Sequence, residues 1–185
     1  MNEVSAERSS TVTVPTGLEW QTALAESFIG NGINVAAFVP DSRLHGLVEQ
    51  LAAGGVTLRS MAREEECVSY AAGQRLAGRN PLVVFQSSGL GNCLNALATL
   101  VVPSRLGVPI VISMRGSLSE GNPSQIPIGR AVDAILSSVG IASFPMQHAA
   151  EATDLANGVC ELAFKARECA AILLTPQLGG GRETR

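Results

Sequence analysis

REEECVSYAAGQRLAGRNPLVVFQSSGLGN, residues 63–92, joins a helix-like segment that starts with three acids to a short apolar strand and a glycine-rich turn. The helix is expected over residues 62–76 and closes on Gly78. The strand, residues 81–86, is apolar almost throughout and does not alternate between apolar and polar residues. Such runs are typical of strands that are buried on both faces. This stretch therefore predicts one unit of an α/β fold.

The same alternation continues in both directions along the chain. Asp41 or Ser42 is expected to cap a helix after the first strand. A helix is also expected before or after each of the remaining strands. Six strands alternating with helices predict a doubly wound, mainly parallel sheet with helices on both faces and right-handed crossovers. The expected strands are residues 33–39, 56–60, 81–86, 108–114, 141–145 and 170–174.

The length of 185 residues suits one domain with a sizeable core. Residues 1–15 are polar and are expected to form a disordered leader without the apolar segment of a secretion signal. Residues 16–176 form the expected domain, in which Thr16 caps the first helix. Residues 177–185 are expected to be a flexible tail.

Composition excludes several classes of partner and site. A net charge of −3 argues against nucleic acid, and no apolar run is long enough for a transmembrane helix. None of the four cysteines belongs to a Cys-x-x-Cys pair, so no metal site is predicted. Cysteines in apolar surroundings are typical of reduced core residues, and His45 and His148 occupy positions that suit a structural role. The composition is that of a cytoplasmic protein.

Polar residues follow the second, third and fourth strands. Because open α/β sheets bind ligands beyond the carboxyl ends of their strands, these residues are expected to meet at one edge. They are Glu64, the turn Ser88-Gly89-Leu90-Gly91-Asn92, Arg115 and Gln125.

Three motifs carry a resemblance to a known family. They are the acidic helix start with Ala-Ala-Gly at residues 63–73, Phe-Gln-Ser-Ser-Gly-Leu-Gly-Asn at 85–92, and Arg-Gly at 115–116 with Gln-Ile-Pro-Ile-Gly at 125–129. The chain resembles the pyrimidine-binding (alpha) subunit of thiamine-diphosphate-dependent decarboxylases. It is most similar to the sulfopyruvate decarboxylase alpha subunit and the N-terminal half of phosphonopyruvate decarboxylase, from about residue 16 to 175.

The resemblance implies roles for the residues at the predicted edge. The activating glutamate of such families stands nine residues before the glycine of Ala-Ala-Gly, which selects Glu64 as the catalytic residue that bonds the cofactor's pyrimidine ring. Ser88, Gly89, Leu90 and Gly91 would form the wall beside thiamine diphosphate. Asn92, Arg115 and Gln125 would face the substrate. The cofactor's thiazolium ring would accept the electrons left when a 2-oxo acid loses CO2.

Each of these residues also has a plainer interpretation. Acids at a helix start are favoured by the helix dipole, which suits Glu65 and Glu66 in particular. Gly89 and Gly91 suit a backbone that passes close to a flat ring or adopts positive φ, and the plainer alternative is a tight strand-to-helix turn without a ligand. Asn92 suits the cap of the following helix equally well. Arg115 either binds a carboxylate, sulfonate or phosphonate group, or it is an ordinary surface residue.

The Gly-Asp-Gly motif that holds Mg2+ and the cofactor's diphosphate in this family does not occur in the sequence. The resemblance therefore implies a separate beta subunit that supplies these contacts. The implied activity is decarboxylation of a 3-sulfo- or 3-phosphonopyruvate-like 2-oxo acid to the aldehyde. Two alternatives stay open: a thiamine-diphosphate-dependent carboligase subunit that forms acyloins, and a non-catalytic homologue that serves assembly or regulation.

Overall fold

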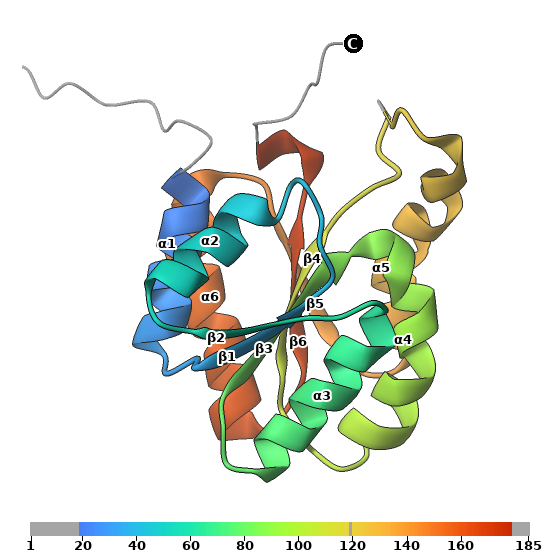
Figure 1. Ribbon diagram of the computed structural model, residues 1–185. Helices are drawn as coiled ribbons and strands as arrows, with labels where there is room; N and C mark the ends of the chain where they lie inside the picture. The colour runs from blue at the N-terminus through green and yellow to red at the C-terminus, as the bar shows by residue number, and fades with distance from the viewer. Residues whose placement is uncertain (1–18, 119, 179–185) are drawn as a thin grey trace, which may run out of the picture.

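A computed structural model describes residues 19–118 and 120–178, which form a single parallel sheet with helices on both faces (Figure 1). The predicted fold class is confirmed. The strands are β1 (Val35–Phe38), β2 (Thr57–Ser60), β3 (Pro81–Gln86), β4 (Pro109–Ser113), β5 (Ala142–Met146) and β6 (Ala170–Leu174).

The strand order is β2-β1-β3-β4-β6-β5, and every neighbouring pair is parallel. The chain leaves β1 for β2 on one side and then returns to β3 on the other side of β1. The order of strands thus reverses between β1 and β3. In a doubly wound sheet, the crevice at such a point, beyond the carboxyl ends of the strands, is where ligands bind.

Three helices cover each face of the sheet (Figure 1). One face carries α1 (Glu19–Gly30), α2 (His45–Ala53) and α6 (Ala152–Glu161). The other carries α3 (Glu64–Leu76), α4 (Leu90–Ala96) and α5 (Ile126–Ser138). The central strands are apolar on both sides because each face is covered: Val83 and Phe85 pack toward α3 and α4, whereas Leu82 and Val84 pack toward α1 and α2.

Several boundaries differ from the prediction. The turn expected over residues 88–92 is mostly helical, because α4 begins at Leu90, directly after a 3-10 turn, η1 (Ser87–Gly89). The predicted glycine loop is therefore the start of a helix, with Gly89 at φ −85° in ordinary right-handed backbone. The N-cap of α2 is Leu44 rather than Asp41 or Ser42.

The two ends of the predicted domain lie partly outside the described residues. The leader at residues 1–15 and the cap at Thr16 belong to the part that the structure does not describe. The tail was expected from residue 177, but Gln177 and Leu178 belong to the 3-10 helix η6 (Pro176–Leu178), and the side chain of Leu178 is buried in the core.

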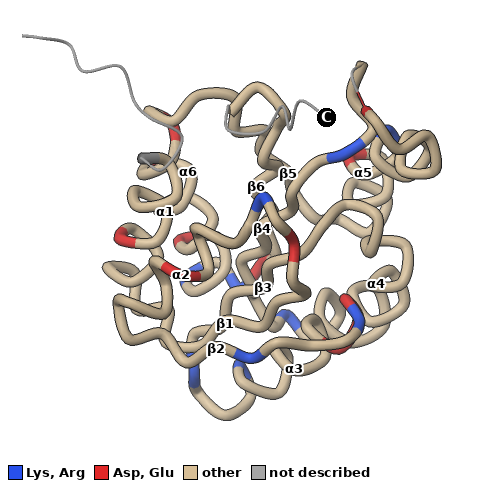
Figure 2. Tube along the Cα trace, turned by 45° about the horizontal axis from the view of Figure 1, so that its top comes forward, with Lys and Arg blue, Asp and Glu red and all other residues tan. Residues whose placement is uncertain are grey.

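Charges are spread over the molecule. Figure 2 shows acidic and basic positions interspersed along the trace, in line with the small net charge of −3. Within the described ranges, no helix combines the length and hydropathy needed to cross a bilayer. The same residues contain no group of three His, Cys, Asp or Glu side chains that could hold a metal ion.

Candidate active site

Glu64 is the first residue of α3, and its half-buried side chain lies across Gly89 at the start of α4. A Cβ atom at Gly89 would overlap the Cγ and carboxyl atoms of Glu64. Among the described residues, the Glu64 carboxylate has no hydrogen-bond or ion-pair partner. The carboxylate is thus held by packing, and its oxygens are available to a ligand.

The two neighbouring acids each have a local partner. Glu66 Oε2 accepts from the backbone N–H groups of Ala62 and Arg63 at 3.1 and 3.2 Å, which satisfies amides at the helix start. Glu65 Oε1 pairs with Arg63 Nε at 2.7 Å. Of the three acids, Glu64 alone is left without such a contact.

Two buried thiols lie close enough to Glu64 to sense its charge. Burial, and next the Glu64 carboxylate, raise the pKa of Cys67 to about 12, and the same two causes raise the pKa of Cys93. Both cysteines are free, as are Cys160 and Cys169. Both thiols are therefore uncharged at neutral pH.

The turn from β3 to α4 places its predicted ligand residues differently. Ser88 is exposed, and its hydroxyl donates to Gln86 Oε1 at 2.6 Å. The side chain of Leu90 is fully buried in the core, so only its backbone can face a ligand. Gly91 and Asn92 are exposed in the first turn of α4. Asn92 does not cap this helix, because its N-cap is Gly89.

The structure reveals a second cluster, which centres on Asp41. This residue follows β1, and only 6% of its side chain is exposed. Its Oδ2 accepts from Gln86 Nε2 at 2.6 Å and from Arg115 Nη2 at 3.3 Å. Its Oδ1 accepts from the backbone N–H of Arg43 at 2.9 Å and from the Ser113 hydroxyl at 3.4 Å. A nearly buried carboxylate that gathers four donors is a fixed anionic anchor.

Arg115 follows β4 and lies at this cluster rather than on an open surface. A quarter of its side chain, 25%, is exposed. Its backbone N–H donates to Ser87 Oγ at 3.0 Å, and the buried Nε has no hydrogen-bond partner among residues 19–118 and 120–178. Its guanidinium therefore keeps donors that Asp41 does not use.

Gln86 and Gln125 connect the two parts of the site. Gln125 ends the 3-10 helix η3 (Pro123–Gln125), and its Nε2 donates to Gln86 Oε1 at 3.0 Å. The same oxygen accepts from Ser88, and the other end of the Gln86 amide bonds Asp41. Hydrogen bonds thus run continuously from Asp41 to the turn that carries Gly89 and, beside it, Glu64.

Arg43 ties the ends of several strands together. Its Nη1 donates to the carbonyl of Met114 at 2.9 Å, and its Nη2 donates to that of Thr175 at 3.1 Å. Burial and the nearby charge of Arg115 lower the pKa of this guanidinium. Both carbonyls end strands of the sheet, so Arg43 positions the edge on which Arg115 stands.

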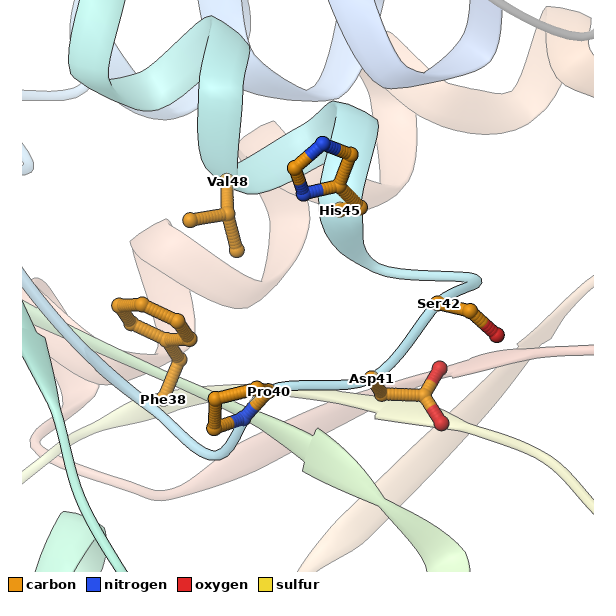
Figure 3. Close-up of a pocket in the computed structure, with 6 residues that line it drawn as sticks. All are labelled: Phe38, Pro40, Asp41, Ser42, His45 and Val48. Carbon is orange, nitrogen blue, oxygen red and sulfur yellow. The ribbon is translucent and has the colours of Figure 1, made fainter.

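A pocket of about 290 Å3 adjoins Asp41 on the α2 side of the sheet (Figure 3). Phe38, Pro40 and Val48 give it an apolar wall, and His45 lies above them. The Asp41 carboxylate points away from Phe38, toward the cluster described above.

Sequence reasoning missed Asp41, Gln86 and Arg43. A signal was present, because Asp41 lies in the segment after buried strand β1, at the point where strand order reverses. It was interpreted only as a helix cap. Of the residues predicted from sequence, the structure brings Glu64 against Gly89 and links Ser88, Arg115 and Gln125 through Gln86 and Asp41.

The chain fits the pyrimidine half of a thiamine-diphosphate site. Glu64 offers a carboxylate without an internal partner, and the glycine beneath it leaves the space that the carboxylate occupies. Gly91 and Asn92 leave the first turn of α4 open beside it. When bound, the cofactor supplies the electron sink for decarboxylation of a 2-oxo acid.

A solved structure shares the fold. In 2-oxoglutarate:ferredoxin oxidoreductase from Magnetococcus marinus, with 2-oxoglutarate, coenzyme A and succinyl-CoA bound, the matching region superposes with a TM-score of 0.65 at 15% identity. The match covers 86% of this chain and 29% of that chain. At this identity the likeness concerns the fold alone.

Comparison with known sequences gives the family, although no family model matches the chain. The alpha subunit of sulfopyruvate decarboxylase from Methanococcus maripaludis is 31% identical over 153 residues, 82% of this chain and 92% of that subunit. Sulfopyruvate decarboxylase from Methanosarcina acetivorans is 37% identical over 110 residues, 60% of this chain and 28% of that protein. Phosphonopyruvate decarboxylase from Streptomyces viridochromogenes is 31% identical over 103 residues, 55% of this chain and 26% of that protein. The predicted resemblance is confirmed, and the chain belongs to the family of sulfopyruvate decarboxylase alpha subunits.

Proposed function

We propose that this chain is the alpha subunit of a thiamine-diphosphate-dependent decarboxylase that converts a 3-sulfo- or 3-phosphonopyruvate-like 2-oxo acid to the aldehyde and CO2. The observation that carries the proposal is the Glu64 carboxylate, which lies across Gly89 at the carboxyl edge of the sheet without an internal partner. In this position it bonds the pyrimidine ring of the cofactor and holds the proton there. Ser88 and the exposed first turn of α4 border the ring.

The substrate class is supported by the relatives and by charge. The relatives are named for sulfopyruvate and phosphonopyruvate, which both carry a second acidic group. Arg115 stands at the same edge, and its buried Nε has no hydrogen-bond partner in the part of the chain that the structure describes. A planar guanidinium suits a sulfonate or phosphonate. Gln125 and Asn92 would contact the rest of the substrate.

A partner chain is part of the proposal. The M. maripaludis relative is named a subunit alpha. Among the described residues, the large apolar side chains that are exposed include Leu76 on α3, Leu94 on α4 and Leu100 on the π-turn Leu97–Val101 that follows it. α3 packs against α4 and this π-turn, and Glu64 stands at the start of α3, so a beta subunit docked along these segments would complete the site. It would supply most contacts to Mg2+ and the diphosphate. The four free, buried cysteines support a cytoplasmic location.

The test is Glu64→Gln in the complex recovered by co-purification with the partner chain. The amide keeps the size of the side chain but removes its acid–base function, so kcat with sulfopyruvate should fall ~100-fold or more. Glu65→Gln, the same change one residue along, is the control and should keep kcat. Mass measurement checks that both variants assemble. Unchanged turnover in the assembled Glu64→Gln complex would contradict the proposal and favour a non-catalytic role.

Product analysis separates decarboxylation from carboligation. The complex is incubated with sulfopyruvate, with and without an added acceptor aldehyde. The proposal expects the free aldehyde and CO2 in both cases. Acyloin as the main product would identify a carboligase instead.

A further inference from the structure

We propose that Asp41 is a positioning residue that gives the site its preference for substrates with a second acidic group. This inference rests on the proposed function. Asp41 lies outside the turn that would border the cofactor, and its role would be to hold the side chains of Arg115 and Gln86 in the orientation that binds substrate.

The first step in the argument is the position of Asp41. It follows β1 at the strand-order reversal, beside the ends of β3 and β4, which carry Gln86 and Ser113. Its carboxylate is 6% exposed and contacts donors from all three strand ends. A buried carboxylate is costly unless it is paired, so its retention here requires the donors around it.

The second step is the way in which Arg115 is held. Nη2 is engaged with Asp41, the backbone N–H bonds Ser87, and the side chain is mostly buried. The contact with Asp41 is the only ion pair that Arg115 makes among the described residues. Asp41 thus anchors the back of the guanidinium, and the donors on its exposed part are left for the acidic group of a substrate.

The third step is the orientation of the Gln86 amide. Asp41 accepts from Gln86 Nε2, which turns Oε1 toward Ser88 and Gln125, and both of these donate to it. An asparagine at position 41 would offer a single acceptor oxygen to the four donors that converge on the Asp41 carboxylate. Either the Gln86 amide would reverse, placing its NH2 against the two donors, or Arg115 would lose its anchor.

The kinetic test compares sulfopyruvate with pyruvate, which lacks the second acidic group, in the complex with the partner chain. Asp41→Asn should lower the preference for sulfopyruvate, measured as the ratio of the two kcat/KM values, by about tenfold, mainly through KM for sulfopyruvate. Glu49→Gln is the matched control. It removes one negative charge from exposed Glu49 on α2, which pairs with His45, and should leave the ratio unchanged.

The double variant Asp41→Asn/Gln86→Glu exchanges amide and carboxylate within the same hydrogen-bond chain. It retains the net charge, lets position 41 donate to position 86, and keeps an acceptor for Ser88 and Gln125. The preference for sulfopyruvate should return toward the wild-type value. This pair keeps a carboxylate in the buried cluster, so it decides the question if the single variant does not fold. A double variant that folds but shows no recovery would overturn the proposal, as would an unchanged ratio in Asp41→Asn.

A spectroscopic measurement tests the placement of Arg115 without depending on turnover. In the 1H–15N spectrum of the full chain, the Arg115 Nε–H signal, assigned by its loss in Arg115→Lys, should be resolved because Nε is buried. Asp41→Asn should move it to the position of free arginine or broaden it by solvent exchange. An unchanged signal would show that Asp41 does not position Arg115. If the wild-type complex lacks decarboxylase activity, the proposed function fails, while this measurement still tests the anchor.

Discussion

Gly89 is required for space rather than for backbone freedom. Its φ of −85° is open to any residue, but the position of its missing Cβ is filled by the Cγ and carboxyl group of Glu64. The backbone does not adopt the positive φ that the sequence allowed, and the group that approaches this glycine is a side chain of the protein itself. Glu64 and Gly89 therefore form one packed unit.

Gly89→Ala should reduce activity without unfolding the protein. The added methyl group meets the far end of a flexible side chain, so Glu64 can rotate away while the backbone stays in place. Because the acid then leaves its position, kcat of the complex should fall ~100-fold, as for loss of a general acid–base group. Gly158→Ala, at an open position on α6, is the control. Full activity of Gly89→Ala would show that the exact placement of Glu64 does not matter.

Because of the buried thiols, the free energy of unfolding should depend on pH in the alkaline range. Burial raises the pKa of Cys67 and Cys160 to about 12 and of Cys169 to about 11. Unfolded thiols ionise above about pH 8.5, whereas the native ones keep their protons. Stability from these groups is therefore complete below that pH and is lost as pH rises through the native pKa values.

Each such thiol should lower the free energy of unfolding by up to ~1.4 kcal/mol per pH unit within this window. Urea unfolding between pH 8 and 10 measures the slope, which should be smaller in Cys160→Ala than in the wild type. As a companion measurement, Ellman's reagent at pH 8 should label none of the four thiols rapidly in the native protein and all four in urea. Rapid native labelling would contradict the burial of these residues.

At the scale of elements, α5 approaches the turn after β4 so closely that only glycine fits. A Cβ at Gly129 would overlap the carbonyl group of Arg115, and Gly116, at φ +81°, faces the carbonyls of Gln125 and Ile126. The residue after β4 is thus fixed from its main chain as well as through its side chain. This contact places Arg115 and Gln125 on opposite sides of one narrow junction.

Gly129→Ala should destabilise the fold. The methyl group meets backbone instead of a rotatable side chain, so α5 must shift away from the Arg115 turn at a cost of roughly 1–3 kcal/mol. Gly158→Ala provides the comparison: in an exposed helix with open space it should stabilise by about 0.5–1 kcal/mol. Urea unfolding of both variants gives the two values. Equal stability of Gly129→Ala and wild type would show that the junction is looser than described.

The elements themselves were largely predictable from sequence. Strands β3 and β6 have the predicted bounds, because uninterrupted apolar runs between polar or glycine residues leave little choice of register. The start of α4 was missed because Gly89 and Gly91 suggested a loop, whereas packing of Leu90 into the core favours a helix there. Asp41, Gln86 and Arg43 were missed because their partners come from strands that lie far apart in sequence. Only the strand order brings them together.

At the scale of the molecule, α3 carries three small residues in a row, Ala71, Ala72 and Gly73. Ala71 and Ala72 pack into the protein's own core. Gly73 alone is exposed, with nothing close to where a Cβ would lie. It lies on the same helix as exposed Leu76, where we propose that the partner chain docks.

Gly73→Ala should therefore separate folding from assembly. In the free chain it should stabilise α3 by about 0.5–1 kcal/mol, like Gly158→Ala, because both are exposed helix glycines. In the complex it would crowd a close contact, and the affinity for the partner should fall about tenfold, at the low end of the cost of overpacking. Titration calorimetry with the purified partner and urea unfolding give the two quantities. Equal affinity of Gly73→Ala and Gly158→Ala for the partner would show that the partner binds at another surface.

The way in which Glu64 is seated has a consequence for maturation in the cell. Its carboxylate rests on a glycine and has no hydrogen-bond or ion-pair partner within residues 19–118 and 120–178. In the proposed enzyme, thiamine diphosphate and the beta subunit would therefore be able to bind in either order, because neither would first have to break such a contact of Glu64.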